Sequence, residues 1–279
     1  MPLPPDFHFS QSSLKDYFDC PRRFELRHLQ KVKWPAPLSE PILEQERHIM
    51  LGEQFHHLLH QLFIGIPPDL LTSSLRSKEL REWWDAFNRS GLLDTLPQNR
   101  HPEKMISASW ERYRFLAKLD LLAGSPGQRW VIVDWKTSTH RPPSKLLKND
   151  IQSRLYPFLL VQAGNSLNNG EPLLPDQVEM IYWFANFPGQ IEEIHYSQEK
   201  YQKDREDFTK LAREISGIPA GRFLMTDDER KCRFCNYRSL CNRGDTAGDW
   251  RELEEEALEI GNGEGFHDID FDQIGEIAF

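Results

Sequence analysis

Two residues of opposite charge end the most strand-like segment of the chain. Asp134 and Lys136 close a run of apolar and β-branched residues that begins at Trp130. Successive side chains of a strand point to opposite faces, so Asp134 and Lys136 share one face and Trp135 lies on the other. Such a pair can be a solvated ion pair or part of a reactive centre, and a single Asp-x-Lys tripeptide does not separate these alternatives.

Asp120 is a second carboxylate that a short turn could bring to Asp134. It ends another strand-like segment, and the intervening Gly124-Ser125-Pro126-Gly127 favours a hairpin. Two neighbouring carboxylates repel each other unless a cation lies between them, and Mg²⁺ or Mn²⁺ suits oxygen ligands. Phosphodiester hydrolysis needs such an ion, together with a cation like Lys136 that offsets developing charge.

Four short motifs, in order and with matching spacing, resemble those of a known nuclease family. They are the Asp120, Asp134 and Lys136 set of the PD-(D/E)XK nucleases and, from their RecB-like exonuclease branch, a Gly-x-x-x-His motif at Gly52–His56, a Gln-x-x-x-Tyr motif at Gln152–Tyr156 and a domain start at residues 9–24. The resemblance covers roughly residues 9–241 and implies a restriction-endonuclease-like core.

The resemblance implies a role for each residue of the centre. Asp120, Asp134, the main-chain carbonyl of Trp135 and His56 would bind the metal ion. Lys136 would orient the attacking water and offset charge in the transition state.

The remaining motif residues depend on helix geometry. Gln152 and Tyr156 are four residues apart, so they share one helical face and would line the site. Pro157 follows directly and should kink the helix or end its first part. Gly52 precedes His56 on one helical face, where a glycine permits the close approach of a neighbouring segment.

The chain has four cysteines: Cys20, Cys232, Cys235 and Cys241. In a reducing compartment, this pattern favours one tetrathiolate site for zinc or an iron–sulfur cluster over disulfides. It resembles the iron–sulfur RecB-like nucleases, including the CRISPR-associated adaptation nuclease and the AddB-type subunit. That resemblance implies a [4Fe–4S] cluster, with zinc or unrelated thiols as alternatives. The site would join the two ends of the domain as a structural staple.

Six basic residues flank the cysteines and would gather around their site, either to contact a phosphate backbone or to balance the charge of a cluster. They are Arg22, Arg23, Lys231, Arg233, Arg238 and Arg243.

Periodicity predicts an α/β fold with a mixed central sheet flanked by helices and a helical N-terminal portion. Helices are expected near residues 10–30 (broken at Cys20-Pro21), 42–63, 76–89, 145–165 and 197–216. Strands are expected at 106–110, 113–122, 130–136, 178–184 and 191–196, with a loop through Pro102.

Charge divides the chain into two parts. Twelve of its 43 acidic residues and one of its 34 basic residues lie in residues 244–279, so the net charge of −9 leaves the other residues slightly basic. We therefore expect a nuclease domain at 1–243 and an acidic, flexible tail at 244–279. The sequence has no apolar run of membrane-spanning length and no secretory signal, which predicts a cytoplasmic protein.

These features predict a metal-dependent DNA nuclease. By resemblance, we expect exonuclease action on single-stranded or end-containing DNA, in repair, recombination or CRISPR-type processing. A slightly basic body predicts modest nonspecific affinity, and hence a helicase or other protein partner. The alternatives are a structure-specific endonuclease, a non-catalytic DNA-binding partner of a helicase, and a zinc-stapled RNA-processing protein.

Overall fold

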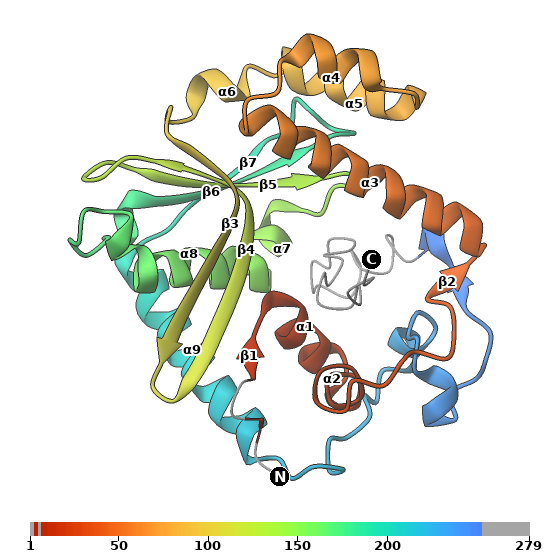
Figure 1. The fold of residues 1–279 in the computed structure, drawn as a ribbon. Helices are drawn as coiled ribbons and strands as arrows, with labels where there is room; N and C mark the ends of the chain where they lie inside the picture. Colours follow the sequence, from red (N-terminus) through yellow and green to blue (C-terminus); the bar gives the residue numbers. More distant parts are fainter. Residues whose placement is uncertain (1–2, 5–6, 253–279) are drawn as a thin grey trace, which may run out of the picture.

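A six-stranded mixed sheet lies at the centre of the computed structural model, which describes residues 3–4 and 7–252 (Figure 1). Five strands follow the order β1 (His8–Phe9), β4 (Tyr113–Gly124), β5 (Trp130–Lys136), β6 (Val178–Phe184) and β7 (Glu192–His195), and β3 (Arg100–Trp110) also pairs with β4. β1 with β4 and β5 with β6 are parallel, and the other pairs are antiparallel. The predicted α/β class with a mixed sheet is confirmed.

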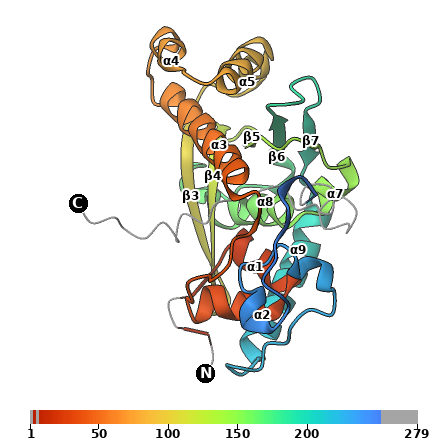
Figure 2. The same ribbon diagram turned by 90° about the vertical axis from the view of Figure 1, so that its right-hand side faces the viewer.

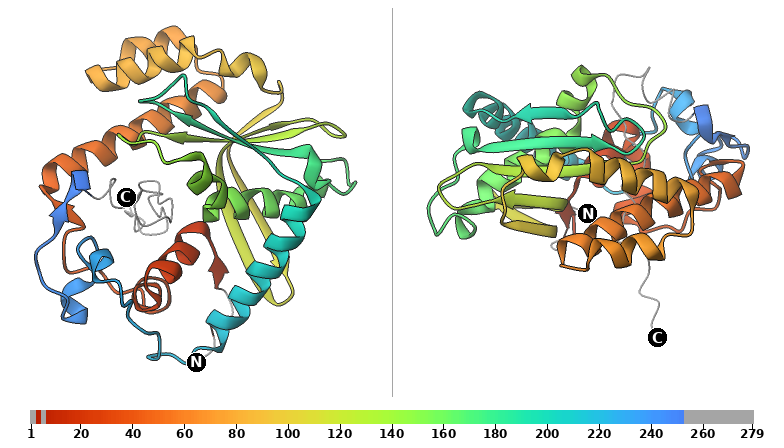
Figure 3. Two further views of the ribbon diagram at one scale, coloured as in Figure 1. Left: turned by 180° about the vertical axis from the view of Figure 1, so that it is seen from behind. Right: turned by 90° about the horizontal axis from the view of Figure 1, so that it is seen from above.

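Helices cover both faces of the sheet (Figures 1 and 2). One face carries α3 (Ile42–Phe63), α4 (Pro68–Ser74), α5 (Lys78–Arg89) and α6 (Leu92–Thr95); the other carries α1 (Gln11–Asp19), α7 (Ser144–Asn149), α8 (Ile151–Ala163) and α9 (Gln198–Gly217). After α1 the chain continues through α2 (Pro21–Phe24). β2 (Ser39–Glu40) and β8 (Gly248–Asp249) pair beside the N-terminal end of α3, away from the main sheet (Figure 3). Among the described residues, no helix is both long and apolar enough to cross a bilayer.

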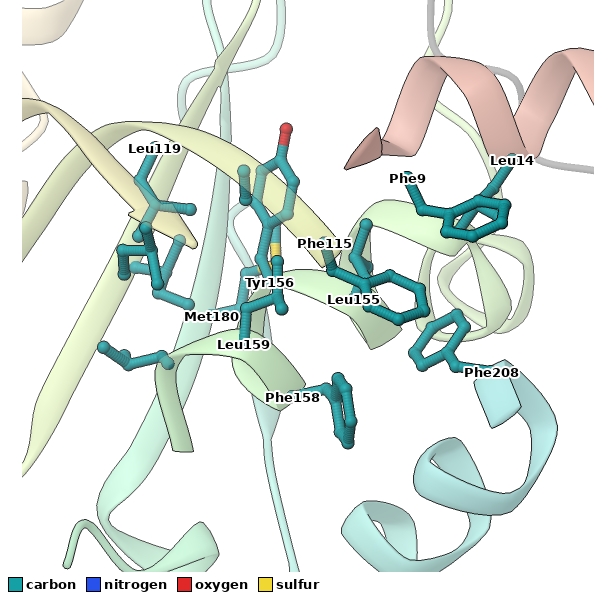
Figure 4. Close-up of a cluster of buried hydrophobic side chains, with 14 of the residues drawn as sticks. Phe9, Leu14, Phe115, Leu119, Leu155, Tyr156, Phe158, Leu159, Met180 and Phe208 are labelled. Atoms are coloured by element: carbon teal, nitrogen blue, oxygen red, sulfur yellow. The ribbon is translucent and has the colours of Figure 1, made fainter. Parts of the chain in front are cut away.

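β5 is buried on both faces, which explains its continuous apolar sequence. Val131, Val133 and Trp135 pack in the cluster under α3 and α5, while Trp130 and Ile132 pack in the cluster under α8 and α9. Figure 4 shows part of the second cluster. Alternation therefore directs Asp134 and Lys136 to the α8 face and Trp135 to the α3 face, as predicted.

β4 changes its packing at Asp120. Phe115, Ala117 and Leu119 belong to the α8-side cluster, whereas Leu121 belongs to the α3-side cluster. β3 occupies one edge of β4 along nearly its whole length, so β1 and β5 must share the other edge at opposite ends. The sequence predicted that Asp120 ends its strand. In the structure Asp120 lies inside β4, at the place where β5 joins that edge.

Two predicted ranges differ clearly from the structure, and several short elements were not predicted. β3 begins at Arg100 and contains Pro102, which an edge strand tolerates because one of its sides makes no ladder bonds. The predicted helix over 145–165 is divided at Asp150 into α7 and α8, and α8 continues through Pro157 without ending there. The short helices α4 and α6 and the two-residue strands β1, β2 and β8 were not predicted.

The end of the β4–β5 hairpin is closed by a glycine packed under an indole, which gives a test of this register. A Cβ at Gly124 would lie 2.3 Å from a ring atom of Trp130, its partner across the two strands. Gly124→Ala should therefore lower the free energy of unfolding by about 1–3 kcal/mol, as overpacking does. Urea unfolding would measure it, with Gly189→Ala as the control, because a Cβ at Gly189 meets open space. Equal stability of the two variants would show that Trp130 moves aside freely.

Candidate active site

The ladder between β4 and β5 sets Asp120 across from Asp134. The antiparallel register ends with Leu121 opposite Val133, and one residue further it would pair the two aspartates. In place of a ladder bond, the Trp135 amide N–H donates to Asp120 Oδ2 at 3.0 Å. The two carboxylates that the sequence singled out therefore lie together where the strands separate.

Helix α3 brings His56 to the other oxygen of Asp120, with 3.4 Å between His56 Nδ1 and Asp120 Oδ1. One turn earlier on α3, a Cβ at Gly52 would lie 2.9 Å from Thr137 Oγ1. The helix thus crosses directly against the chain that leaves β5, and Gly52 permits this approach, as predicted. Thr137 was not foreseen, because a threonine after a strand carries no signal until its neighbour is known.

Asp134, Lys136 and Gln152 form a closed triangle of one ion pair and two hydrogen bonds. Lys136 Nζ lies 2.8 Å from Asp134 Oδ2 and 2.9 Å from Gln152 Oε1, and Gln152 Nε2 donates to Asp134 Oδ1 at 2.5 Å. The Gln152 side-chain amide can bond both residues in one orientation only, with its oxygen toward the Lys136 ammonium and its nitrogen toward the Asp134 carboxylate. Asp134 and Gln152 are 4% and 2% exposed, so water competes little for these charge-assisted bonds.

Gln152 reaches the triangle from the first turn of α8. The Asp150 side chain caps this helix by accepting the Gln152 main-chain N–H at 2.8 Å. Sequence inspection missed Asp150, although an aspartate before an apolar helical segment is a usual start signal. Tyr156, one turn after Gln152, lies buried in the apolar cluster with Leu155 and Leu159 (Figure 4).

The side chains expected to bind the metal ion are paired with other groups in this structure. In the part of the chain that the structure describes, no three His, Cys, Asp or Glu side chains converge closely enough to hold one metal ion. Instead Asp120 faces His56, and Asp134 faces Lys136. The donor types nevertheless fit a divalent cation, because Mg²⁺ and Mn²⁺ take carboxylate and carbonyl oxygens and imidazole also suits transition metals.

Pairing shifts the titration of His56 and Asp120. Burial lowers the pKa of His56, but the Asp120 carboxylate and its hydrogen bond outweigh this and raise it to about 9. Burial raises the pKa of Asp120, yet His56 and the Trp135 N–H lower it below its ordinary value. Without a metal ion, both members of the pair are therefore charged at neutral pH.

The four cysteines line one pocket, at the junction of α1 and α2 with the segment that follows α9. Burial raises the pKa of Cys232, Cys235 and Cys241, to about 11 for Cys235, and neighbouring cysteines raise it further. Four thiolates can share this pocket stably only if a cationic group balances their charge.

The six basic residues that flank the cysteines are bound by protein groups. Arg22 pairs with Glu25, Arg23 with Asp16 and Asp19, Lys231 with Asp19, Arg233 with Glu252 and Arg243 with Glu229, while Arg238 donates to the carbonyls of Pro37, Cys235 and Asp245. The basic residues do gather here, but acidic partners gather with them.

Two residues of the expected acidic tail, Trp250 and Arg251, pack against α3. The indole of Trp250 stacks on His48, with 5.5 Å between ring centroids, and donates to Glu44 at 3.0 Å. Arg251 also donates to Glu44, at 2.6 Å. The rest of the expected tail, residues 253–279, lies outside the described residues.

The His56–Asp120 pair predicts a pH-dependent stability. Because the folded-state pKa of His56 is raised, its contribution is fully present below about pH 6.5 and is lost as the pH rises through about 9. His56→Gln should therefore lower the free energy of unfolding more at about pH 6 than at about pH 9.5. Urea unfolding in EDTA would measure this, with His60→Gln on the same helix as the control. A loss that does not change with pH would contradict the pairing.

Comparison with known proteins gives a family and two distant structural likenesses. Residues 8–242 match the family described as the PD-(D/E)XK nuclease superfamily. A search of the curated proteins gave no match. Among solved structures, a provisionally assigned exonuclease from Eubacterium rectale has a TM-score of 0.46 at 12% identity, covering 75% of this chain and 81% of its own. The protein SSO0001 has a TM-score of 0.39 at 15% identity, covering 85% and 86%. Since the family match spans most of the sequence, the chain belongs to the PD-(D/E)XK nuclease superfamily.

Proposed function

We propose that this chain is a metal-dependent nuclease that hydrolyses DNA phosphodiester bonds at Asp120, Asp134 and Lys136. One observation carries the proposal: the Lys136 ammonium is bound to Asp134 at 2.8 Å, at the place where the strand register sets Asp120 across from Asp134. The superfamily supplies the reaction class. A lysine whose side chain is 12% exposed, held between a carboxylate and an oriented amide, supplies the local chemistry that this class requires.

The residues that would hold Mg²⁺ or Mn²⁺ are Asp120, Asp134, His56 and the main-chain carbonyl of Trp135. When bound, such an ion supplies Lewis acidity at the phosphate and makes a bound water more acidic. His56 would have to give up the proton that Asp120 now stabilises, because imidazole binds metals in its neutral form.

Lys136 is the cationic side chain that would stabilise negative charge in the transition state. Its ammonium can orient a water molecule and offset the charge that develops on the phosphate. Gln152 holds it through an amide oxygen 2.9 Å away. Tyr156 lies one turn further along α8. Its buried side chain would anchor the face of the helix that also carries Gln152.

The proposed substrate is single-stranded or end-containing DNA, and the proposed mode is exonucleolytic. Support comes from the RecB-like motifs, because His56 and Gln152 reach the same centre from two separate helices. Repair, recombination and CRISPR-type processing are processes that use such an enzyme, with a helicase or other protein as partner. A structure-specific endonuclease is the alternative mode.

Replacing Lys136 should nearly abolish cutting, and this loss has to be measured on folded protein because Asp134 also loses its charged partner. With end-labelled single-stranded DNA and Mn²⁺ or Mg²⁺, we expect Lys136→Ala to lower the cleavage rate by at least about a hundredfold, since a preorganised charge at the transition state is lost. EDTA should stop the wild type. The matched control is Lys210→Ala, an exposed lysine of α9 that should cut like the wild type.

Circular single-stranded DNA distinguishes the two modes. An enzyme that needs ends should leave the circle intact while it degrades the linear strand. Cutting of the circle would establish the endonuclease instead, and degradation of RNA but not DNA would favour an RNA-processing role. A folded wild type that cuts no nucleic acid with either metal would refute the proposal.

We also propose that Cys20, Cys232, Cys235 and Cys241 bind a [4Fe–4S] cluster, with zinc as the alternative. The support is that every cysteine of the chain lines one pocket, which brings Cys20 together with the three cysteines near the other end of the domain. Soft thiolates favour these two metals. Bound there, the cluster would staple the α1–α2 junction to the segment after α9.

Metal and sulfide analysis of protein purified without oxygen tests this site. We expect about four iron and four sulfide ions per chain. Cys232→Ala should lose them and unfold at lower urea concentration, because a cross-link between distant segments is lost. Met225→Ala, which alters the same pocket but keeps all thiols, is the control. One zinc ion per chain would establish the alternative, and a fully stable Cys232→Ala protein would refute a staple.

A further inference from the structure

We propose that Tyr182 is a positioning residue for Lys136, an inference that rests on the proposed function. Tyr182 lies on β6 directly beside Asp134 in the parallel register of β5 and β6. Its side chain is 1% exposed, so it cannot bind substrate from solvent. It contacts the site from within the protein, through its ring and through its hydroxyl group.

The ring of Tyr182 gives Lys136 a third point of attachment. Lys136 Nζ lies 5.5 Å from the ring centroid, within the range where an aromatic face attracts a cation. Asp134 holds the same ammonium through an ion pair, and Gln152 holds it through a hydrogen bond. Lys136 is therefore held from three elements, β5, α8 and β6, and its freedom to choose another rotamer is reduced.

The hydroxyl group of Tyr182 holds the turn that carries Gln152. Ser153 directly follows Gln152, and its hydroxyl donates to the main-chain carbonyl of Leu147. A serine hydroxyl has one hydrogen, so Tyr182 must be the donor in its 2.8 Å contact with Ser153 Oγ. One side chain thus contacts Lys136 with its ring and fixes the first turn of α8 with its hydroxyl.

These two contacts set the distance between Lys136 and Gln152. The two residues lie on different elements, β5 and α8. The hydrogen bond from Lys136 to Gln152 therefore forms only if the first turn of α8 keeps its present distance from the sheet. A shift of about 1 Å in a reacting group can cost about a hundredfold in rate. Tyr182 therefore acts on the turnover rate through Lys136, and not on the binding of DNA.

Two substitutions of Tyr182 separate its ring from its hydroxyl. With single-stranded DNA and Mn²⁺, we expect Tyr182→Phe to lower kcat about three- to tenfold and Tyr182→Leu about thirty- to a hundredfold, each with KM within about twofold of wild type. The matched control is Tyr201→Phe, which removes a hydroxyl that accepts from Gln162 at the other end of α8 and should leave kcat unchanged.

An NMR measurement tests the ring contact without any cleavage. The side-chain methylene protons of Lys136 next to Nζ, assigned by their loss in Lys136→Arg, should be shielded by the ring in the wild type and in Tyr182→Phe. Tyr182→Leu should remove the shielding. Unchanged shifts in Tyr182→Leu, or a folded Tyr182→Leu enzyme with wild-type kcat, would overturn the inference. A wild type that does not cut DNA would instead defeat the proposed function, and the NMR result would still decide whether Tyr182 holds Lys136.

Discussion

The burial of the Asp134 carboxylate is the constraint on which the centre depends. This carboxylate is 4% exposed at the end of a strand whose other side chains are almost all apolar. A buried charge is costly unless it is paired and hydrogen-bonded. Lys136 and Gln152 supply both conditions, one from the same strand and one from α8. The start of α8 is therefore fixed by an electrostatic requirement as well as by apolar packing.

The neighbouring carboxylate is stabilised differently. Asp120 accepts the main-chain N–H of Trp135 and faces His56, so its charge is shared between the backbone of β5 and helix α3. The glycine at position 52 lets α3 lie against Thr137, immediately after the strand that carries Asp134 and Lys136. The two carboxylates thus hold elements from opposite faces of the sheet, and their separation is set by the end of the β4–β5 ladder.

Much of this was predictable because strand and helix periodicity directly control which side chains share a face. The range predicted for α3 and the placing of Asp134 and Lys136 on one face of β5 agree with the structure. The position of Asp120 inside β4 was not predictable, because the end of a ladder depends on where two other strands share an edge. Asp150 and Ser153 were missed because their roles depend on distant partners. The RecB-like branch, the cluster and the tail remain predictions.

The acidic partners of the basic residues around the cysteine pocket weaken the electrostatic attraction of this region for DNA. Each of these cations except Arg238 is already paired with a carboxylate. Cations that are already paired displace few condensed counterions from a phosphate backbone, so these residues should add little to the ionic-strength dependence of association with the proposed substrate. Long-range attraction would then contribute little to capture. Delivery of a strand to the centre would depend on short-range fit, or on a second protein that already holds the DNA.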